Sequence, residues 1–265
     1  MQETPFRASP PLALRTPTAL VRELATPPLL NATSGDRTEL LVLMFHRAQA
    51  GTLGNSPAML DAHFAHVAAN YPCVLPGEPL QAGCLNVCLS FDDGCLDFYQ
   101  TVLPLLEIHR LRALLAIPPG LIVDSPAVPY KASAELCSWA ELREIAASGR
   151  VAFAAHGMTH IRLDNPAVDL GREVSDPGLV LTVKLLLTIE SFVFPFGRFS
   201  PLALQTARTH YHHVFRIGGA INTGWDASVL YRVSADNLTG PADIFAPAKL
   251  RRYRLRRWWN RLRCR

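Results

Sequence analysis

The sequence has no segment suited to cross a membrane, and it has few charges for its length. No run reaches the roughly 18 apolar residues that a membrane-spanning helix needs. The N-terminus lacks a basic start followed by an uninterrupted apolar stretch, so we expect no secretory signal and a cytoplasmic protein. Charged residues make up 18% of the chain and apolar residues 49%. This composition excludes a chain that is disordered over its whole length.

Three further features are missing. The six cysteines form no CxxC pair, which favours reduced thiols over a disulfide framework. No internal repeat is visible, and "IGGAIN" (217–222) lacks the Lys-Ser/Thr helix start of a phosphate-binding loop. The 265 residues suit one large domain, since a single α/β barrel takes roughly 200–250.

Acidic residues are absent from Lys249–Arg265, which holds nine of the 26 Lys and Arg residues. We predict a basic amphipathic C-terminal tail, 241–265, with Leu255, Trp258, Trp259 and Leu262 at helical spacing. Such a helix suits an anionic membrane surface, a nucleic-acid arm or docking on its own domain. We expect peripheral association with an anionic inner membrane face through 249–265, and no nucleic acid.

Short apolar runs alternate with helix-like segments from Glu39 onward. Residues 1–38 are rich in Pro, Thr and Ala and are predicted to form an irregular extension. Strand-length runs occur at 39–45, 85–91, 113–118, 151–155, 192–196 and 213–218, and helical patterns at 56–71, 98–111, 138–149 and 200–211. The alternation predicts an α/β domain, 39–240, with a mostly parallel sheet.

Polar residues follow these runs where each strand should end. His46, Asp92, Asp93 and His156 do so, and Pro195–Gly197 closes a further run. The carboxyl ends of parallel strands form one rim, which carries the active site in such folds. We therefore expect these residues to converge.

The pattern "HGMTH" places His156 and His160 four residues apart. In a helical turn both imidazoles would share one face, and one carboxylate would complete a three-ligand metal site; packing or capping histidines are the alternative. The neighbouring charges of Asp92 and Asp93 are compatible if Asp93 binds a cation and Asp92 stays ionised as a base. A turn that caps a helix is the alternative for "DDG".

Together "SFDDG" (90–94), "HGMTHIRL" (156–163) and "FPFG" (194–197) resemble the polysaccharide deacetylases, the NodB-homology carbohydrate esterases. "LMFHR" near residue 46 is similar to the branch related to poly-N-acetylglucosamine deacetylases. The resemblance implies a single-domain, distorted (β/α)7-type barrel. It also implies a metal-dependent hydrolase that removes N-acetyl groups from an amino-sugar polymer or its precursor. A lipid-linked precursor at the inner membrane face would fit both the missing secretory signal and the basic tail.

The resemblance also implies roles for individual residues. Asp92 would be the general base and His46 the general acid. Asp93, His156 and His160 would hold a divalent metal, Zn²⁺ by preference, with Co²⁺, Ni²⁺ or Fe²⁺ as alternatives. The backbone of Pro195, Phe196 and Gly197 would hold the acetyl oxygen.

The sequence departs from the family pattern at several positions. Gly157 replaces a Ser or Thr, Phe194 and Phe196 replace tyrosines, and a Pro-Gly pair at 177–178 interrupts a segment that is a longer helix in relatives. Two alternatives therefore stay open: a hydrolase of a non-sugar C–N bond, and a catalytically silent carbohydrate-binding relative. A substrate groove is expected to include Trp225, Asp226 and Arg232, for which a packed aromatic and a rim ion pair are the alternatives.

Overall fold

The computed structural model describes residues 38–123, 129–130 and 134–263. The predicted irregular extension, 1–38, lies outside these ranges except for its last residue. Within them, no helix has the length and apolar character needed to span a bilayer.

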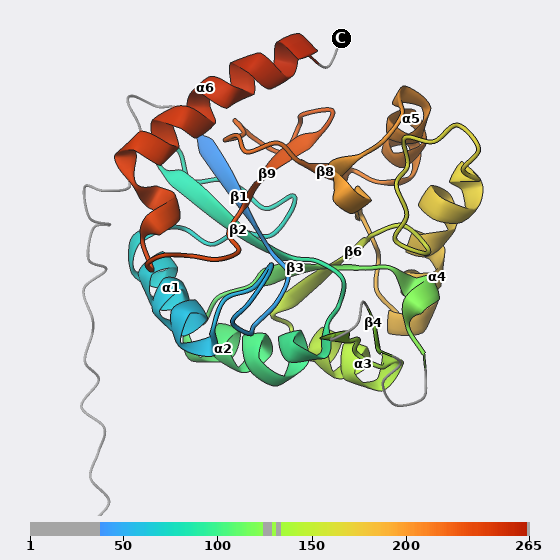
Figure 1. Cartoon of the computed structure of the whole chain (residues 1–265), viewed down its shortest axis with the longest axis horizontal. Helices are drawn as coiled ribbons and strands as arrows, with labels where there is room; N and C mark the ends of the chain where they lie inside the picture. The colour runs from blue at the N-terminus through green and yellow to red at the C-terminus, as the bar shows by residue number, and fades with distance from the viewer. Residues whose placement is uncertain (1–37, 124–128, 131–133, 264–265) are drawn as a thin grey trace, which may run out of the picture.

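The core of the fold is a closed barrel of seven parallel strands (Figure 1). In barrel order they are β1 (Glu39–Phe45), β2 (Leu85–Phe91), β3 (Ala113–Ile117), β6 (Val151–Ala155), β7 (Ser191–Val193), β8 (His213–Ile217) and β9 (Leu230–Ser234), and β9 pairs with β1. The register is unbroken between β1 and β2, from Glu39 opposite Leu85 to Phe45 opposite Phe91. The predicted distorted (β/α)7-type barrel is confirmed.

Helices surround the barrel on its outer face (Figure 1). They are α1 (Pro57–Asn70), α2 (Leu103–Ile108), α3 (Trp139–Ala147), α4 (Asp176–Leu185), α5 (Pro201–His210) and α6 (Pro247–Arg263). A small hairpin, β4 (Pro129–Tyr130) and β5 (Ala134–Glu135), lies outside the barrel. Helix α3 begins at a capping box: Ser138 Oγ accepts from Glu141 N, and the Glu141 carboxylate accepts from Ser138 N.

The two faces of the strands pack into two separate cores. Outward-facing residues such as Leu41 and Leu43 pack with the helices, against Phe64 of α1 and Leu142 of α3, for example. The alternate residues fill the barrel, and these include Leu40, Val42, Cys88, Leu114, Ala154, Val193 and Phe215. Because both faces are buried, the strands have near-continuous apolar sequences.

The Pro-Gly pair at 177–178 does not interrupt α4, as the sequence had suggested, but lies in its first turn. Proline is tolerated there because the first N–H groups of a helix have no partner within it. Gly178 is needed for packing: a Cβ at this position would lie 2.7 Å from the hydroxyl of Tyr211. That hydroxyl accepts from Gly178 N and donates to the Val174 carbonyl.

The basic tail forms α6, which packs against the barrel over part of its surface. Tyr253 is buried, and its carbonyl accepts from Ile221 N. Arg254 makes two hydrogen bonds to the carboxylate of Glu39 at the start of β1. The docked-helix interpretation therefore describes one side of α6, while other side chains of the helix remain exposed.

Candidate active site and metal centre

The carboxyl ends of β1, β2 and β6 bring three predicted side chains together. His46 follows β1, Asp92 follows β2, and His156 follows β6. The Nε2 atoms of His46 and His156 lie 3.9 and 3.8 Å from Asp92 Oδ2. The Asp92 and His156 side chains are almost fully buried, and His46 is partly exposed at the rim.

Asp93, His156 and His160 form a group suited to a metal ion. One candidate ligand atom from each lies within 4.8 Å of the other two. Asp93 Oδ1 is 3.1 Å from His160 Nε2 and 3.8 Å from His156 Nε2. His156 Nδ1 lies 2.8 Å from the Val193 carbonyl; an N–H there would donate to it and leave the Nε2 lone pair for a metal.

The two histidines do not share a helix face, because residues 156–160 form an irregular loop. Gly157 and His160 have left-handed backbone conformations, with φ of 71° and 54°. The helical-turn hypothesis for "HGMTH" is therefore wrong, although the loop still brings both imidazoles near Asp93.

Asp93 and Gly94 also have a left-handed conformation, each with φ of 72°. Asp tolerates this region better than most residues, because its short side chain can bond locally. Gly94 is required: a Cβ there would lie 2.5 Å from Ile117 Cδ1. The left-handed turn at Asp93 and Gly94 lets the two neighbouring carboxylates contact different partners, Arg232 for Asp92 and His160 for Asp93.

Glu173, a residue that sequence reasoning missed, holds the histidine loop. Its buried carboxylate accepts from Met158 N and Thr159 N, each at 3.0 Å, and from Thr159 Oγ1 at 2.7 Å. Thr159 thus supplies a supporting hydroxyl near Gly157. No local pattern marks Glu173, because it is 14 residues from Thr159 and lies in the π-helical turn Gly171–Ser175 that leads into α4.

Arg232 lies inside the barrel and binds the carboxylate of Asp92, so it does not line a substrate groove as predicted. Its two terminal nitrogens donate to the two carboxylate oxygens at 2.6 and 2.8 Å, and one also donates to Ser90 Oγ. Burial by itself would raise the pKa of Asp92, but the charges of Arg232 and His156 outweigh it and hold that pKa at about 2. Asp92 is therefore a carboxylate at neutral pH.

Asp236, also missed, orients His46. Its carboxylate accepts from the His46 backbone N–H at 3.0 Å and lies 2.7 Å from His46 Nδ1. Burial lowers the pKa of His46, but Asp236 and the charge of Asp92 outweigh burial and raise it overall. A polar residue just after β9, at the same rim, was the available sequence signal.

The predicted Pro195–Gly197 segment forms a 3₁₀ turn beside the metal-ligand group. The ring of Phe196, half exposed, packs edge-on to His160 at a centroid distance of 4.7 Å. Gly197 has φ of 63°, and a Cβ there would lie 3.1 Å from Ile217. The turn thus forms one wall of the site.

Trp225 and Asp226 do not reach this site. The Trp225 indole packs on His213, the first residue of β8, and its Nε1 donates to the Glu78 carbonyl. It closes the barrel interior at the end where the strands begin, and Asp226 is exposed next to it. The packed-aromatic alternative describes Trp225, and the groove prediction for both residues is wrong.

The sequence model of a family described as polysaccharide deacetylase matches residues 81–215. The chain belongs to the polysaccharide deacetylase family. The match begins before β2 and ends in β8, so it contains Asp92, Asp93, His156 and His160. No curated protein matches this polysaccharide deacetylase in sequence.

Solved structures share the fold. IcaB from Ammonifex degensii has a TM-score of 0.67 at 21% identity, with 80% of this chain and 96% of that chain covered. The de-N-acetylase from Aggregatibacter actinomycetemcomitans has 0.63 at 21%, covering 76% and 97%. The Streptococcus pyogenes deacetylase PplD, solved with acetate, has 0.66 at 21%, covering 78% and 97%.

The donor set of this family member fits a divalent metal. Two imidazoles and one carboxylate form a three-ligand set of the kind that leaves positions open on a catalytic zinc. The contact of His156 Nδ1 with the Val193 carbonyl and the support of the histidine loop by Glu173 resemble the outer hydrogen bonds that orient metal ligands.

Proposed function

We propose that this polysaccharide deacetylase is a metal-dependent hydrolase that removes N-acetyl groups from an N-acetylated amino-sugar glycan or its precursor. The observation that carries the proposal is the convergence of an ionised Asp92, an Asp236-bound His46 and the Asp93–His156–His160 group at one barrel rim. Among metals of this donor preference we propose Zn²⁺, with Co²⁺, Ni²⁺ or Fe²⁺ able to use the same ligands.

In the proposed mechanism, Asp92 acts on the attacking water, together with the metal, and His46 acts on the leaving amine. A divalent metal, when bound, would lower the pKa of a water molecule and polarise the acetyl carbonyl. Asp92, held as a carboxylate by Arg232, would accept the proton of the attacking water. Phe196 N–H would donate to the developing oxyanion.

His46 is positioned to supply the second proton. Asp236 binds the Nδ1 side of the ring, so Nε2 is the atom that faces Asp92 and the site. Because the hydrogen bond to Asp236 and the charge of Asp92 outweigh burial and raise the pKa of His46, a larger share of this ring is protonated near neutral pH than of an ordinary histidine. We propose that His46 Nε2 donates its proton to the amine nitrogen as the C–N bond breaks, which releases acetate and a free amino sugar.

The decisive experiment measures bound metal and acetate release together. We expect N-acetylglucosamine oligomers to release acetate with the wild type, and Asp92→Asn to keep its metal but lose about 10²–10⁴-fold in rate. Asp226→Asn, at the opposite barrel end, is the matched control and should retain full activity. Metal binding with undiminished rate in Asp92→Asn would overturn the assignment of the base.

We also propose that α6 attaches the protein peripherally to an anionic membrane surface, at the inner face. Leu255, Trp258 and Leu262 form an apolar face whose side chains are each more than 60% exposed. Residues 249–265 carry nine Lys and Arg and no acid, so their charge complements anionic lipid headgroups. Such placement would suit a lipid-linked glycan precursor.

Vesicle flotation tests the membrane proposal. The full-length protein should float with vesicles that contain phosphatidylglycerol and stay behind with phosphatidylcholine alone. Replacing Leu255, Trp258 and Leu262 with Ser should abolish flotation, whereas replacing exposed Leu179 and Val183 of α4 with Ser should not. Equal flotation of the wild type and of the variant with Ser at positions 255, 258 and 262 would contradict the proposal.

A further inference from the structure

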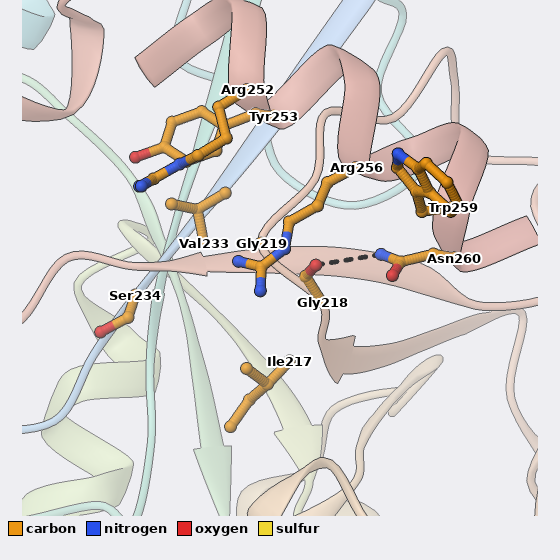
Figure 2. A pocket seen from close by; sticks show the side chains of 10 residues that line it. All are labelled: Ile217, Gly218, Gly219, Val233, Ser234, Arg252, Tyr253, Arg256, Trp259 and Asn260. Carbon is orange, nitrogen blue, oxygen red and sulfur yellow. Dashed lines mark hydrogen bonds between the residues drawn. The ribbon is translucent and has the colours of Figure 1, made fainter. Parts of the chain in front are cut away.

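A cavity of about 590 Å³ lies between α6 and the ends of β8 and β9 (Figure 2). Its volume is within the range of small-molecule sites. Figure 2 shows Arg252 and Arg256 extending from α6 toward Ser234 and Gly219, with Ile217 below them. No acidic side chain lines the cavity, so its two arginines dominate its charge.

Within the described ranges, no carboxylate forms an ion pair with Arg252 or Arg256, whereas Arg254 on the other side of α6 is bound to Glu39. Arg252 stacks over the Tyr253 ring, with 5.7 Å from the guanidinium carbon to the ring centroid. Two guanidinium groups without anionic partners can each offer a pair of parallel N–H donors to a phosphate.

The barrel side of the cavity leaves room for one of these groups. Gly219 has φ of 61°, and a Cβ there would lie 2.8 Å from Arg256 Nη1. The N–H groups of Gly218 and Gly219 both donate to the Arg232 carbonyl, which fixes this loop to β9. Asn260 Nδ2 donates to the Gly218 carbonyl and fixes α6 to the same loop (Figure 2).

The cavity adjoins the candidate active site through two of its lining residues. Ile217 pairs with Arg232 and contacts the turn of Phe196 at Gly197. In the chain, Ser234 is two residues from Arg232, which binds Asp92, and two residues from Asp236, which binds His46. The cavity and the candidate active site thus lie at the same rim, where β8 and β9 end.

We propose that this cavity is a subsite for a phosphate or diphosphate group carried by the N-acetylated sugar substrate. The proposal rests on the proposed deacetylase function and narrows its substrate to phosphorylated amino sugars. Residues of an α-helix are 100° apart, so Arg252 and Arg256 form one stripe of α6, and Leu255 and Trp258 lie on the next face. A phosphate linked to a membrane lipid would enter along that boundary.

Calorimetric titration with pyrophosphate at low salt tests the subsite without requiring turnover. Arg252→Gln and Arg256→Gln should each weaken binding about tenfold or more, because each removes a charged hydrogen-bond donor. Arg251→Gln, an exposed arginine of α6 that does not line the cavity, should change it by less than about twofold. Absence of binding to the wild type, or an equal loss in Arg251→Gln, would overturn the proposal.

Acetate release separates this inference from the proposed function. With N-acetylglucosamine 1-phosphate, kcat/KM should fall about tenfold or more in Arg252→Gln and Arg256→Gln, while neutral oligomers should react as with the wild type. Equal rates on both substrates in all variants would overturn the subsite and leave the deacetylase standing. Arginine-dependent pyrophosphate binding with no acetate release from any substrate would refute the deacetylase alone.

A third experiment identifies whether the phosphate belongs to a lipid or to a soluble sugar phosphate. The same sugar diphosphate is offered free in water and linked to a polyprenyl lipid in vesicles. A preference for the lipid-linked form that disappears when Leu255, Trp258 and Leu262 are replaced with Ser would assign the phosphate to a lipid. Equal use of both forms, with the arginine dependence kept, would assign it to a soluble sugar phosphate.

Discussion

Each buried acid of the site has its own partner, which is how the two neighbouring aspartates coexist. Asp92 is bound by Arg232, and Asp93 lies against His160. Glu173 accepts from backbone and hydroxyl donors, and Asp236 accepts from His46. A buried carboxylate without such partners would be neutralised by a rise in its pKa.

Removing Arg232 should be costly because it leaves the Asp92 carboxylate buried without its counter-charge. We expect Arg232→Gln to lower the free energy of unfolding by about 3–5 kcal/mol, measured by urea unfolding at pH 7. In the background of Asp92→Asn, the same change should cost at least about 1 kcal/mol less, since the neutral amide needs no counter-charge. Strictly additive losses would contradict this account of the pair.

His63 of α1 makes the fold sensitive to acid. Burial lowers its pKa to about 4, and its ring stacks on Phe245 while Nδ1 lies 2.7 Å from the Pro241 carbonyl. The unfolded chain, with a His pKa of about 6.5, takes up this proton first as the pH falls. The contribution of His63 to stability is therefore complete above pH 6.5 and is lost as the pH falls toward 4.

Comparison of His63→Gln with the wild type isolates this effect. Between pH 7 and pH 5 the wild type should lose about 2 kcal/mol more unfolding free energy than the variant, because glutamine takes up no proton. Urea unfolding at both pH values measures the difference. His212→Gln, at an exposed position, should behave as the wild type, and an equal pH dependence for His63→Gln would refute the prediction.

At the scale of elements, the site residues lie just after the strands, and the conformation of the loops there orients their side chains. The left-handed residues Asp93, Gly94, Gly157, His160 and Phe196 all occur in these loops. Such conformations cost energy for residues other than glycine and persist where neighbouring contacts hold them. For the histidine loop the holding contact is Glu173.

Glu173 should therefore control metal affinity without touching the metal. Glu173→Leu leaves Met158 N–H and Thr159 N–H without an acceptor, so we expect metal binding to weaken about 10–100-fold in competition with a chelator. Glu173→Gln keeps one oxygen for the two N–H groups and should stay within a few-fold of the wild type. Equal affinity in all three proteins would show that the loop is held in another way.

At the scale of the whole molecule, apolar side chains close one end of the barrel and the candidate active site lies at the other. Trp225, Val74 and Leu80 pack with the barrel interior where the strands begin. Arg232, Asp92 and His156 lie at the opposite end of the same interior. A metal at that rim would connect two segments of the chain, the turn after β2 and the histidine loop after β6, so metal binding should stabilise the fold.

Removing and restoring metal tests this coupling. For chelator-treated protein, Zn²⁺ at a free concentration 100 times its Kd should add about 2.7 kcal/mol and raise the unfolding midpoint by about 5 °C or more. Asp93→Asn should lose this rise while keeping a backbone that asparagine tolerates at positive φ. Asp226→Asn should show the full rise. A rise that is the same in Asp93→Asn would remove Asp93 from the metal site.

The sequence by itself determined six of the seven barrel strands, all except β9, together with the α/β class and the residues that follow most of those strands. These are local properties: continuous apolar runs report burial on both faces, and polar residues after them report the rim. Partnerships between distant residues were decided by the tertiary structure alone. Arg232 is 140 residues from Asp92, and Asp236 is 190 from His46.

The two wrong predictions from the sequence, for the histidine pair and for Trp225, have the same physical origin: both depend on contacts between distant residues. The histidine pair suggested a helix by spacing, but the long-range contact with Glu173 holds an irregular loop. Trp225 suggested a sugar platform by residue type, but barrel closure placed it at the far end. A hydrogen bond or ion pair forms only between segments that the closed barrel brings within a few ångströms of each other. The separation of two residues in the sequence does not indicate that distance.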